Sequence, residues 1–353
     1  MALRLLQIAL PKNADGKAEK LLEGKEIVGV WEDPREKTRK VIQVLVPAEE
    51  AEELTDKLAS WYEHQDGFRI TLIPIAATVP RDEPSASDKE QSSERAASAL
   101  RDPGRVSREE LLHLAEESLG VNRVFLAMAF LASVVAAIGL VRDDVAVIIG
   151  AMVIAPLLGP NVAMALAVTL GDFALLRRAL LTNIAGFCVG LGVAIVIGRL
   201  PGVELNADAI VSRTNLQLSD LALALAAGSA GAFALSRGLA GALIGVMVAV
   251  ALMPPLVVFG LMAAQFRWEG AAGAALLVSA NVISVNLAGV ATFVAQGVSP
   301  RRWWDGEKAK KATRRAVALW LVLLLVLVLV LVTRQYSISA KTLGPSDHVP
   351  RRT

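Results

Sequence analysis

The chain has 353 residues, of which 54% are hydrophobic, and its 36 Lys and Arg nearly cancel its 34 Asp and Glu. This balance excludes a nucleic-acid binder that depends on a basic surface, and one cysteine excludes an internal disulfide. Of the 70 charges (36 plus 34), residues 1–121 hold 41, residues 122–300 hold 15 and residues 301–353 hold 14. A nearly charge-free middle indicates a soluble head followed by a multi-span membrane domain, not one soluble domain.

A soluble head is predicted for residues 1–80, where apolar or alternating runs are separated by charged turns. The expected order is strand 3–10, helix 13–23, strand 27–31, strand 41–46, helix 48–63 and strand 68–75. This βαββαβ order predicts a ferredoxin-like α+β fold, which supports many functions and assigns none by itself. The head is interpreted either as an oligomerisation or assembly module or as a regulatory, ligand-sensing domain.

Residues 81–106 are predicted to form a flexible linker. The segment is polar and contains no aromatic residue, so it lacks the apolar surface needed to fold alone. Ser107 and Glu110 then fit a capping box. The leucines that follow predict an amphipathic helix over 107–123, lying on the membrane surface.

Seven charge-free stretches predict seven membrane spans, because a helix needs about 17–25 apolar residues to cross the hydrocarbon core. They are residues 124–141, 145–171, 179–198, 221–236, 238–266, 270–300 and 316–333. The fourth stretch is short and rich in Ala, Gly and Ser, which suits a helix packed tightly among neighbours.

The basic residues set the predicted orientation. With seven spans, the flanks on the side of the head carry 14 Lys and Arg, against 4 in the opposite loops. The positive-inside rule therefore predicts a multi-pass protein of a prokaryotic inner membrane, with the N-terminus cytoplasmic and the C-terminus outside. The plan is a head (1–80), a linker (81–106), a surface helix (107–123), membrane repeat one (124–198), an outer loop (199–220), membrane repeat two (221–298), a basic cytoplasmic loop (299–315), a seventh span (316–333) and an outer tail (334–353).

The spans contain an internal similarity. Residues 149–160 and 244–255 agree at six of twelve positions without gaps, and Asn183-Ile-Ala-Gly matches Asn286-Leu-Ala-Gly. Spans one to three therefore repeat as spans four to six, and because three is odd the two copies cross the membrane in opposite senses. Inverted repeats are a recurring construction of transporters, whose site lies near the membrane midplane.

Prolines near the middle of spans two and five predict broken helices. A proline has no N–H to donate to the carbonyl four residues earlier, so Pro156 frees one carbonyl and the adjacent Pro254 and Pro255 free two. Non-helical backbone at this depth persists only inside protein or beside a watery cavity. A kink that serves packing alone is the alternative reading, but paired breaks in two copies favour a substrate or ion site.

Neutral groups must build any such site, since no Asp, Glu, Lys or Arg lies deep in a span. Asn161 directly follows the first break, and Asn286 belongs to the repeated motif with Asn183; the Ser and Thr residues are mostly assigned to helix–helix hydrogen bonds. The predicted binding residues are Met152, Pro156, Gly159, Pro160, Asn161, Asn183, Val250, Ala251, Pro254, Pro255, Asn281 and Asn286.

The segment Val147-Ile-Ile-Gly-Ala-Met-Val-Ile-Ala-Pro-Leu-Leu-Gly-Pro160, together with Ala136-Ala-Ile-Gly-Leu140 and the βαββαβ head, resembles the DUF389 family of prokaryotic multi-span membrane proteins. The resemblance covers roughly residues 1–298 and implies a membrane location, but it supplies no catalytic residues.

Two functions are weighed for the whole chain. The first is a transporter or channel for a small solute or ion, with a regulatory or oligomerising head. The second is a membrane-anchored sensor or scaffold whose head binds a ligand or partner. No zinc-binding HExxH motif or intramembrane Asp pair is found, so we expect no enzyme activity, no catalytic residues, no metal and no cofactor. The expected partners are the lipid bilayer, an unknown small solute or ion, and further copies of the chain, but no nucleic acid.

Overall fold

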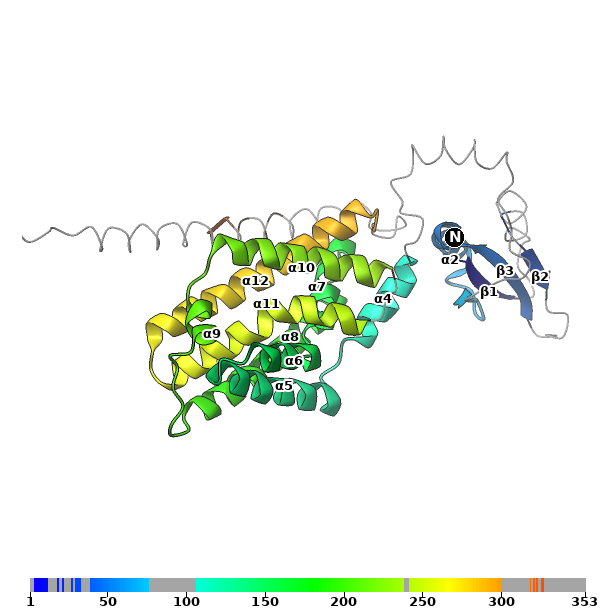
Figure 1. Ribbon diagram of the computed structural model, residues 1–353. Helices are drawn as coiled ribbons and strands as arrows, with labels where there is room; N and C mark the ends of the chain where they lie inside the picture. The colour runs from blue at the N-terminus through cyan, green and yellow to red at the C-terminus, as the bar shows by residue number, and fades with distance from the viewer. Residues whose placement is uncertain are drawn as a thin grey trace, which may run out of the picture.

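The structure is a computed structural model, drawn in Figure 1. It describes residues 3–11, 18, 21, 27, 29–32, 39–75, 106–237, 241–299, 318, 320, 322, 325 and 326. The linker before Val106, most of the predicted basic loop, most of the predicted seventh span and the predicted tail lie outside these residues. The molecule is mostly helical, with one small antiparallel sheet in the head.

The elements with bounds in the described part of the head are four strands and the helix α2, close to the predicted positions. These are β1 (Leu3–Pro11), β2 (Gly29–Glu32), β3 (Arg39–Pro47), α2 (Ala48–Tyr62) and β4 (Arg69–Ile75). The sheet order is β2-β3-β1-β4, and every neighbouring pair is antiparallel. Of the predicted helix 13–23, Ala18 and Leu21 are described and helical, and both pack against the sheet face that α2 covers.

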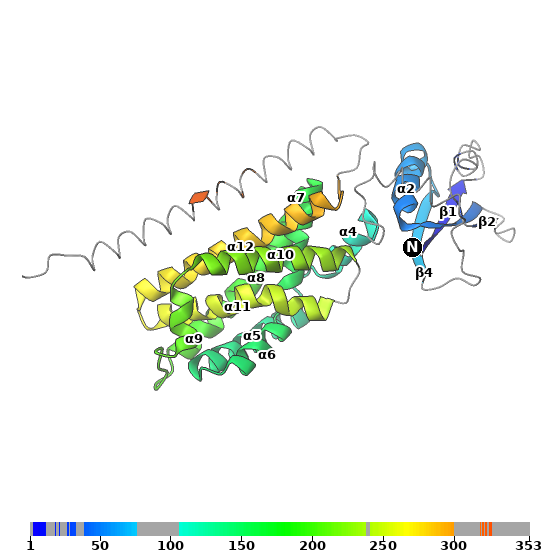
Figure 2. The ribbon, with the colours of Figure 1, turned by 45° about the horizontal axis from the view of Figure 1, so that its top comes forward.

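The helical body begins at residue 108. Its elements are α4 (Arg108–Glu117), α5 (Arg123–Val141), α6 (Val145–Ile154), α7 (Leu158–Leu170), α8 (Phe173–Gly198), α9 (Asp208–Val211), the short 3-10 helix η1 (Ser212–Thr214), α10 (Leu218–Ser236), α11 (Gly241–Ala264) and α12 (Trp268–Ala295). Figure 2 shows α10, α11 and α12 side by side, with α4 between the head and one end of the body. The predicted loop 199–220 contains α9 and η1, which the sequence did not indicate.

Several of these helices fit a multi-pass membrane protein. Among the described residues, α5, α8, α10 and α12 are each long and apolar enough to cross a membrane. The pair α6 and α7 adds a fifth span if it is counted as one bent element, and Leu252–Ala264 within α11 is a shorter apolar helix. The helix α8 begins six residues before the predicted 179, because Asp172 caps its first turn through Ala174 and Leu175.

The short fourth stretch forms α10 and packs closely on α12. A Cβ atom added at Gly228 would overlap the carbonyl oxygen of Val285 and lie 2.7 Å from its Cα, so the two backbones touch. Small residues in an apolar helix permit this approach, as the composition of the stretch predicts.

One predicted break is wrong. The helix α11 runs without interruption through Pro254 and Pro255. The amides that these prolines lack would have bonded to the carbonyls of Val250 and Ala251, whose backbone is helical. From Leu252 onward nearly every residue of α11 is buried, so the prolines lie inside the body.

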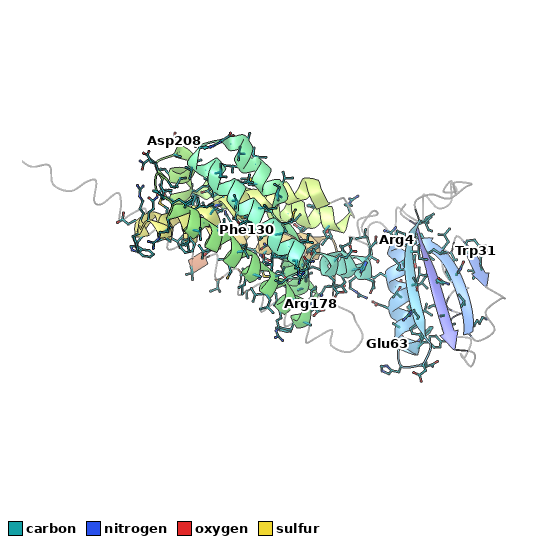
Figure 3. All side chains as sticks on the ribbon, turned by 90° about the horizontal axis from the view of Figure 1, so that it is seen from below. Arg4, Trp31, Glu63, Phe130, Arg178 and Asp208 are labelled. Atoms are coloured by element: carbon teal, nitrogen blue, oxygen red, sulfur yellow. The ribbon has the colours of Figure 1, made fainter. Side chains whose placement is uncertain are left out.

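The helix ends separate into two groups. At the end near the head, the amide of Val106 donates to the carbonyl of Ser236 (2.8 Å) and Arg178 pairs with Glu116. At the opposite end, the amide of Ala209 donates to Asp143 (2.8 Å) and Gln265 donates to the carbonyl of Val203 (2.7 Å). Figure 3 shows the same division, with Arg178 toward the head and Asp208 at the far end.

Candidate functional site

The break between α6 and α7 is the first part of the site. The helix axes bend by 55° between Ile154 and Leu158. The amide of Ala155 still donates to Ala151 (3.1 Å), but Pro156 has no amide for the carbonyl of Met152. Pro160 lies in the first turn of α7, where its missing N–H would have had no intrahelical acceptor. The first predicted break is therefore present, and it lies inside an otherwise apolar pair of helices.

After the break, α7 is enclosed by the rest of the body. It is buried at ten consecutive positions, from Pro160 to Thr169, so no side of this segment faces outward. A helix with one lipid-facing side would alternate buried and exposed positions, as α6 does with Val145, Ile149 and Val153 exposed. The segment that follows the break is thus a central element rather than part of the outer wall.

Three buried asparagines meet beside this break, one from each of three helices. Asn161 of α7 donates from Nδ2 to the side-chain oxygen of Asn183 on α8, at 2.8 Å. Asn286 of α12 donates from Nδ2 to the side-chain oxygen of Asn161, at 3.4 Å. We call these residues the asparagine triad. Sequence reasoning named all three, and the structure brings them into one chain of amides.

Two backbone carbonyls fix the direction of this chain. The Nδ2 of Asn161 also donates to the carbonyl of Leu157 (2.8 Å), and the Nδ2 of Asn286 donates to that of Val282 (2.8 Å). An amide oxygen turned toward either carbonyl would be repelled, so both amides are held in one orientation. Because Asn161 must present its Nδ2 to Asn183, Asn183 must present its oxygen in return.

Two polar atoms, one at each end of this series of three amides, lack a hydrogen-bond partner among the described residues. The Nδ2 of Asn183 and the Oδ1 of Asn286 are buried and have no hydrogen-bond partner within the described part of the chain. The exposed fractions of these two residues are 4% and 0%. A buried polar group without a partner costs about 1–3 kcal/mol, so a pair of them beside a helix break needs an explanation.

The remaining predicted residues occupy different positions. Gly159 lies at the start of α7, and a Cβ atom there would overlap Ser118, just after α4. Asn281 is buried on α12, but five residues from Asn286 and so about 140° around the helix. Pro254 and Pro255 are buried within α11. The structure therefore concentrates the polar site on the first break, with one asparagine contributed by α12.

The helix α4 connects this break with the head. Its Ser107 caps the first turn by accepting from the amide of Glu110 (3.3 Å), as predicted. In a capping box the carboxylate of Glu110 would also accept from the backbone amide of Ser107. Here that carboxylate accepts from Arg4 on β1 instead (2.9 Å). Leu111 and Ala115 are fully buried in one apolar cluster with residues of α7, so this part of the apolar face of α4 packs on protein.

A buried arginine completes the connection. The guanidinium of Arg108, on α4, donates to Asp56 of α2 at 2.6 Å and lies 3.9 Å from Glu52. Burial by itself would lower the pKa of Arg108, but the hydrogen bond to Asp56 and the charge of Glu109 raise it overall, so the group stays charged. Figure 3 shows Arg4 on the side of the head that faces the body.

Sequence reasoning missed this contact. It interpreted Glu110 only as part of a capping box. The ion pairs join residues more than 50 positions apart, and the hydrophobic periodicity of a helix or strand gives no information about such a pairing. The one available signal was Arg108 itself, a charged residue beside the apolar face of the predicted helix.

The described residues contain no group of three or more His, Cys, Asp or Glu that could hold a metal ion. Comparison with known proteins gives two matches. The model of the family described as "Domain of unknown function (DUF389)" matches residues 152–287, a range that begins at the first break and includes the whole asparagine triad. An uncharacterised protein of Methanocaldococcus jannaschii is 32% identical over 322 residues, covering 91% of this chain and 96% of that protein. No solved structure gives a significant match.

Proposed function

The chain belongs to the DUF389 family, and we propose that it is a membrane transporter or channel for a small solute or ion, with its site at the asparagine triad. The observation that carries the proposal is the pair of buried, unpartnered amide atoms beside the break between α6 and α7. A membrane anchor needs neither a broken helix nor buried polar groups without partners. A path for a solute explains both, because non-helical backbone at membrane depth can line such a path and the unpartnered polar atoms can bond to the solute.

The close contacts between helices support an inverted repeat. In the proposed plan, α7 ends the second span and α11 forms the fifth, while α8 and α12 form the third and sixth. A Cβ atom at Gly289 of α12 would lie 2.8 Å from Ala165 of α7, and one at Gly198 of α8 would lie 2.8 Å from Ala264 of α11. The second span of each copy thus contacts the third span of the other copy. The matched asparagines, Asn183 and Asn286, both reach the same cluster, as a two-fold arrangement requires.

We place the end of the body that carries α4 in the cytoplasm. The predicted cytoplasmic flanks around Arg178 and Ser236 both contact the segment 106–118. The predicted outer segments contact one another at the far end, through Asp143 and Ala209 and through Gln265 and Val203. This grouping is the one that seven spans and the positive-inside rule predict.

We assign a regulatory role to the head. Its strand order, β2-β3-β1-β4 with antiparallel neighbours, supports the ferredoxin-like fold that we propose for it. The head is tied to α4 by Arg4 and Arg108, and α4 ends at Ser118, against Gly159 at the break. A displacement of the head would therefore be carried through one short helix to the start of α7.

Replacing Arg108 with alanine is expected to release α4 from the head. The change removes the buried cation between Asp56 and Glu52, and breaking a buried ion pair is strongly destabilising. Amide hydrogens of residues 108–117 should exchange with solvent about tenfold faster, as measured by mass spectrometry. His113→Ala, at an exposed position of the same helix, is the control and should leave the exchange unchanged. Equal exchange in Arg108→Ala and wild-type protein would contradict the coupling.

The proposed function is tested by reconstituting the full chain into lipid vesicles. The entry of urea, glycerol, Na⁺ and K⁺ is compared with entry into protein-free vesicles of the same lipid. The proposal predicts that at least one of these probes enters faster in the presence of the protein. If none does, the second candidate is favoured, namely an anchored scaffold that binds a partner through the exposed Trp31 and Ile73 of its sheet.

A further inference from the structure

Resting on the proposed function, we infer that the asparagine triad takes an uncharged polar solute that accepts one hydrogen bond and donates another. The inference rests on the two side-chain atoms of the triad that make no hydrogen bond to the described residues. Two oxygens in the chain accept from a neighbouring amide, and the Nδ2 groups of Asn161 and Asn286 each donate twice. One donor group, the Nδ2 of Asn183, and one acceptor, the Oδ1 of Asn286, remain.

The two leftover atoms cannot exchange roles. Turning the amide of Asn286 would place its oxygen against the carbonyl of Val282, and turning that of Asn183 would oppose two Nδ2 groups. The carbonyls of Val282, within α12, and of Leu157, immediately before α7, thereby determine the polarity of the whole site. A bound molecule meets a donor at Asn183 and an acceptor at Asn286.

A bare ion fits this pair poorly. A cation bound at the oxygen of Asn286 would leave the Nδ2 of Asn183 unsatisfied and would be repelled by it, and an anion would meet the reverse problem at Asn286. No Asp, Glu, Lys or Arg occurs in α7, in residues 179–198 of α8 or in residues 270–295 of α12 to offset the cost of removing an ion from water. An uncharged solute avoids that cost and satisfies both atoms.

The solute must therefore combine an acceptor and a donor in a small neutral molecule, as a primary amide, urea or a polyol does. The Nδ2 of Asn183 and the Oδ1 of Asn286 would replace two of the hydrogen bonds that such a solute makes with water. The side chains of Leu157, just before α7, and of Val162, on α7, are buried and apolar.

The test uses urea, glycerol, Na⁺ and K⁺ as probes, with the full chain in vesicles, and measures osmotic swelling for the neutral solutes and ion flux with indicator dyes. The inference predicts that urea or glycerol enters at least about tenfold faster than into protein-free vesicles, while the entry of Na⁺ and K⁺ is unchanged. Faster entry of an ion without faster entry of a neutral solute overturns this inference but leaves the proposed function standing. Faster water movement alone overturns the inference too, and no flux of any kind overturns the proposed function.

The variant Asn183→Asp tests the position of the donor. It keeps the size of the side chain and its acceptor for Asn161 but replaces the leftover donor with a second oxygen. Entry of the neutral solute should fall about tenfold, while Thr182→Val, which removes only a bond from the neighbouring residue to the carbonyl of Arg178, should leave it unchanged. Asn183→Ala provides a second loss of the donor if the aspartate variant does not fold. Unchanged entry in a folded variant at position 183 overturns the assignment.

Discussion

Replacing Asn161 with leucine is expected to abolish most solute flux, by about tenfold or more, while the protein remains folded. Asn161 is the middle of the triad, and it contacts both Asn183 and Asn286. Leucine has a similar size but neither donates nor accepts, so the two outer amides lose their connection. The carbonyl of Leu157 also loses its side-chain donor. Flux into vesicles, together with thermal unfolding in detergent, measures the two effects separately.

The stability of the Asn161→Leu protein should change less than its flux. Leaving buried polar groups unpaired costs about 1–3 kcal/mol, but the leucine adds apolar contact in a segment that is buried on every side. Thr182→Val is the matched control, because Thr182 is equally buried on α8 but bonds only within its own helix. Wild-type flux in the Asn161→Leu protein would show that the solute does not pass the triad.

Replacing Gly228 with alanine is expected to destabilise the membrane domain by about 1–3 kcal/mol. The added Cβ atom would overlap the carbonyl oxygen of Val285 and lie 2.7 Å from its Cα. Since these atoms belong to the backbone of α12, no side-chain rotation relieves the overlap, and α10 must move away. The effect is measured as a lower midpoint of unfolding for the purified protein.

The control for this change is Gly192→Ala in α8. No heavy atom lies within 4 Å of the position that its Cβ atom would occupy. Alanine favours a helix over glycine by about 1 kcal/mol, so this variant should be neutral or slightly more stable. Equal destabilisation by both changes would mean that the loss comes from the glycine-to-alanine change itself and not from the contact between α10 and α12.

Local patterns predicted the elements well because each depends on neighbouring residues. The alternation at 41–46 and the apolar run at 3–10 became β3 and β1, and Ser107 became a helix cap. Charge-free stretches became long apolar helices for the same reason. The boundaries moved where a cap lay outside the apolar stretch, as Asp172 does before α8.

Prolines were a weaker guide than the apolar stretches. Pro156 ends α6, whereas Pro254 and Pro255 lie within a continuous helix. Both α7 and α11 are buried after their prolines, so burial does not explain the difference. At the first site a second proline follows four residues after Pro156, and the break places Pro160 in the first turn of α7, where its missing N–H costs no hydrogen bond. Pro254 and Pro255 are adjacent instead, so the spacing of the prolines distinguishes the two sites.

The asparagines show how much of a polar site in an apolar sequence can be predicted before its partners are known. Sequence reasoning selected Asn161 because it directly follows the first break, and Asn183 and Asn286 because they share a repeated motif. It also selected Asn281, which lies on another side of α12 from Asn286. What the sequence could not provide was the partner of each amide, since the bonds join positions 22 and 125 residues apart. The contact between the head and α4 was missed for the same reason.

The central claim is that a solute crosses the membrane at the asparagine triad. The most direct test is the entry of urea and of glycerol into vesicles that contain equal amounts of wild-type protein, Asn161→Leu or Thr182→Val, measured in one series with protein-free vesicles. The account predicts that at least one of the two solutes enters fast with the wild type and with Thr182→Val, and near the protein-free rate with Asn161→Leu. Equal rates for all three proteins with both solutes, whether fast or slow, would contradict it.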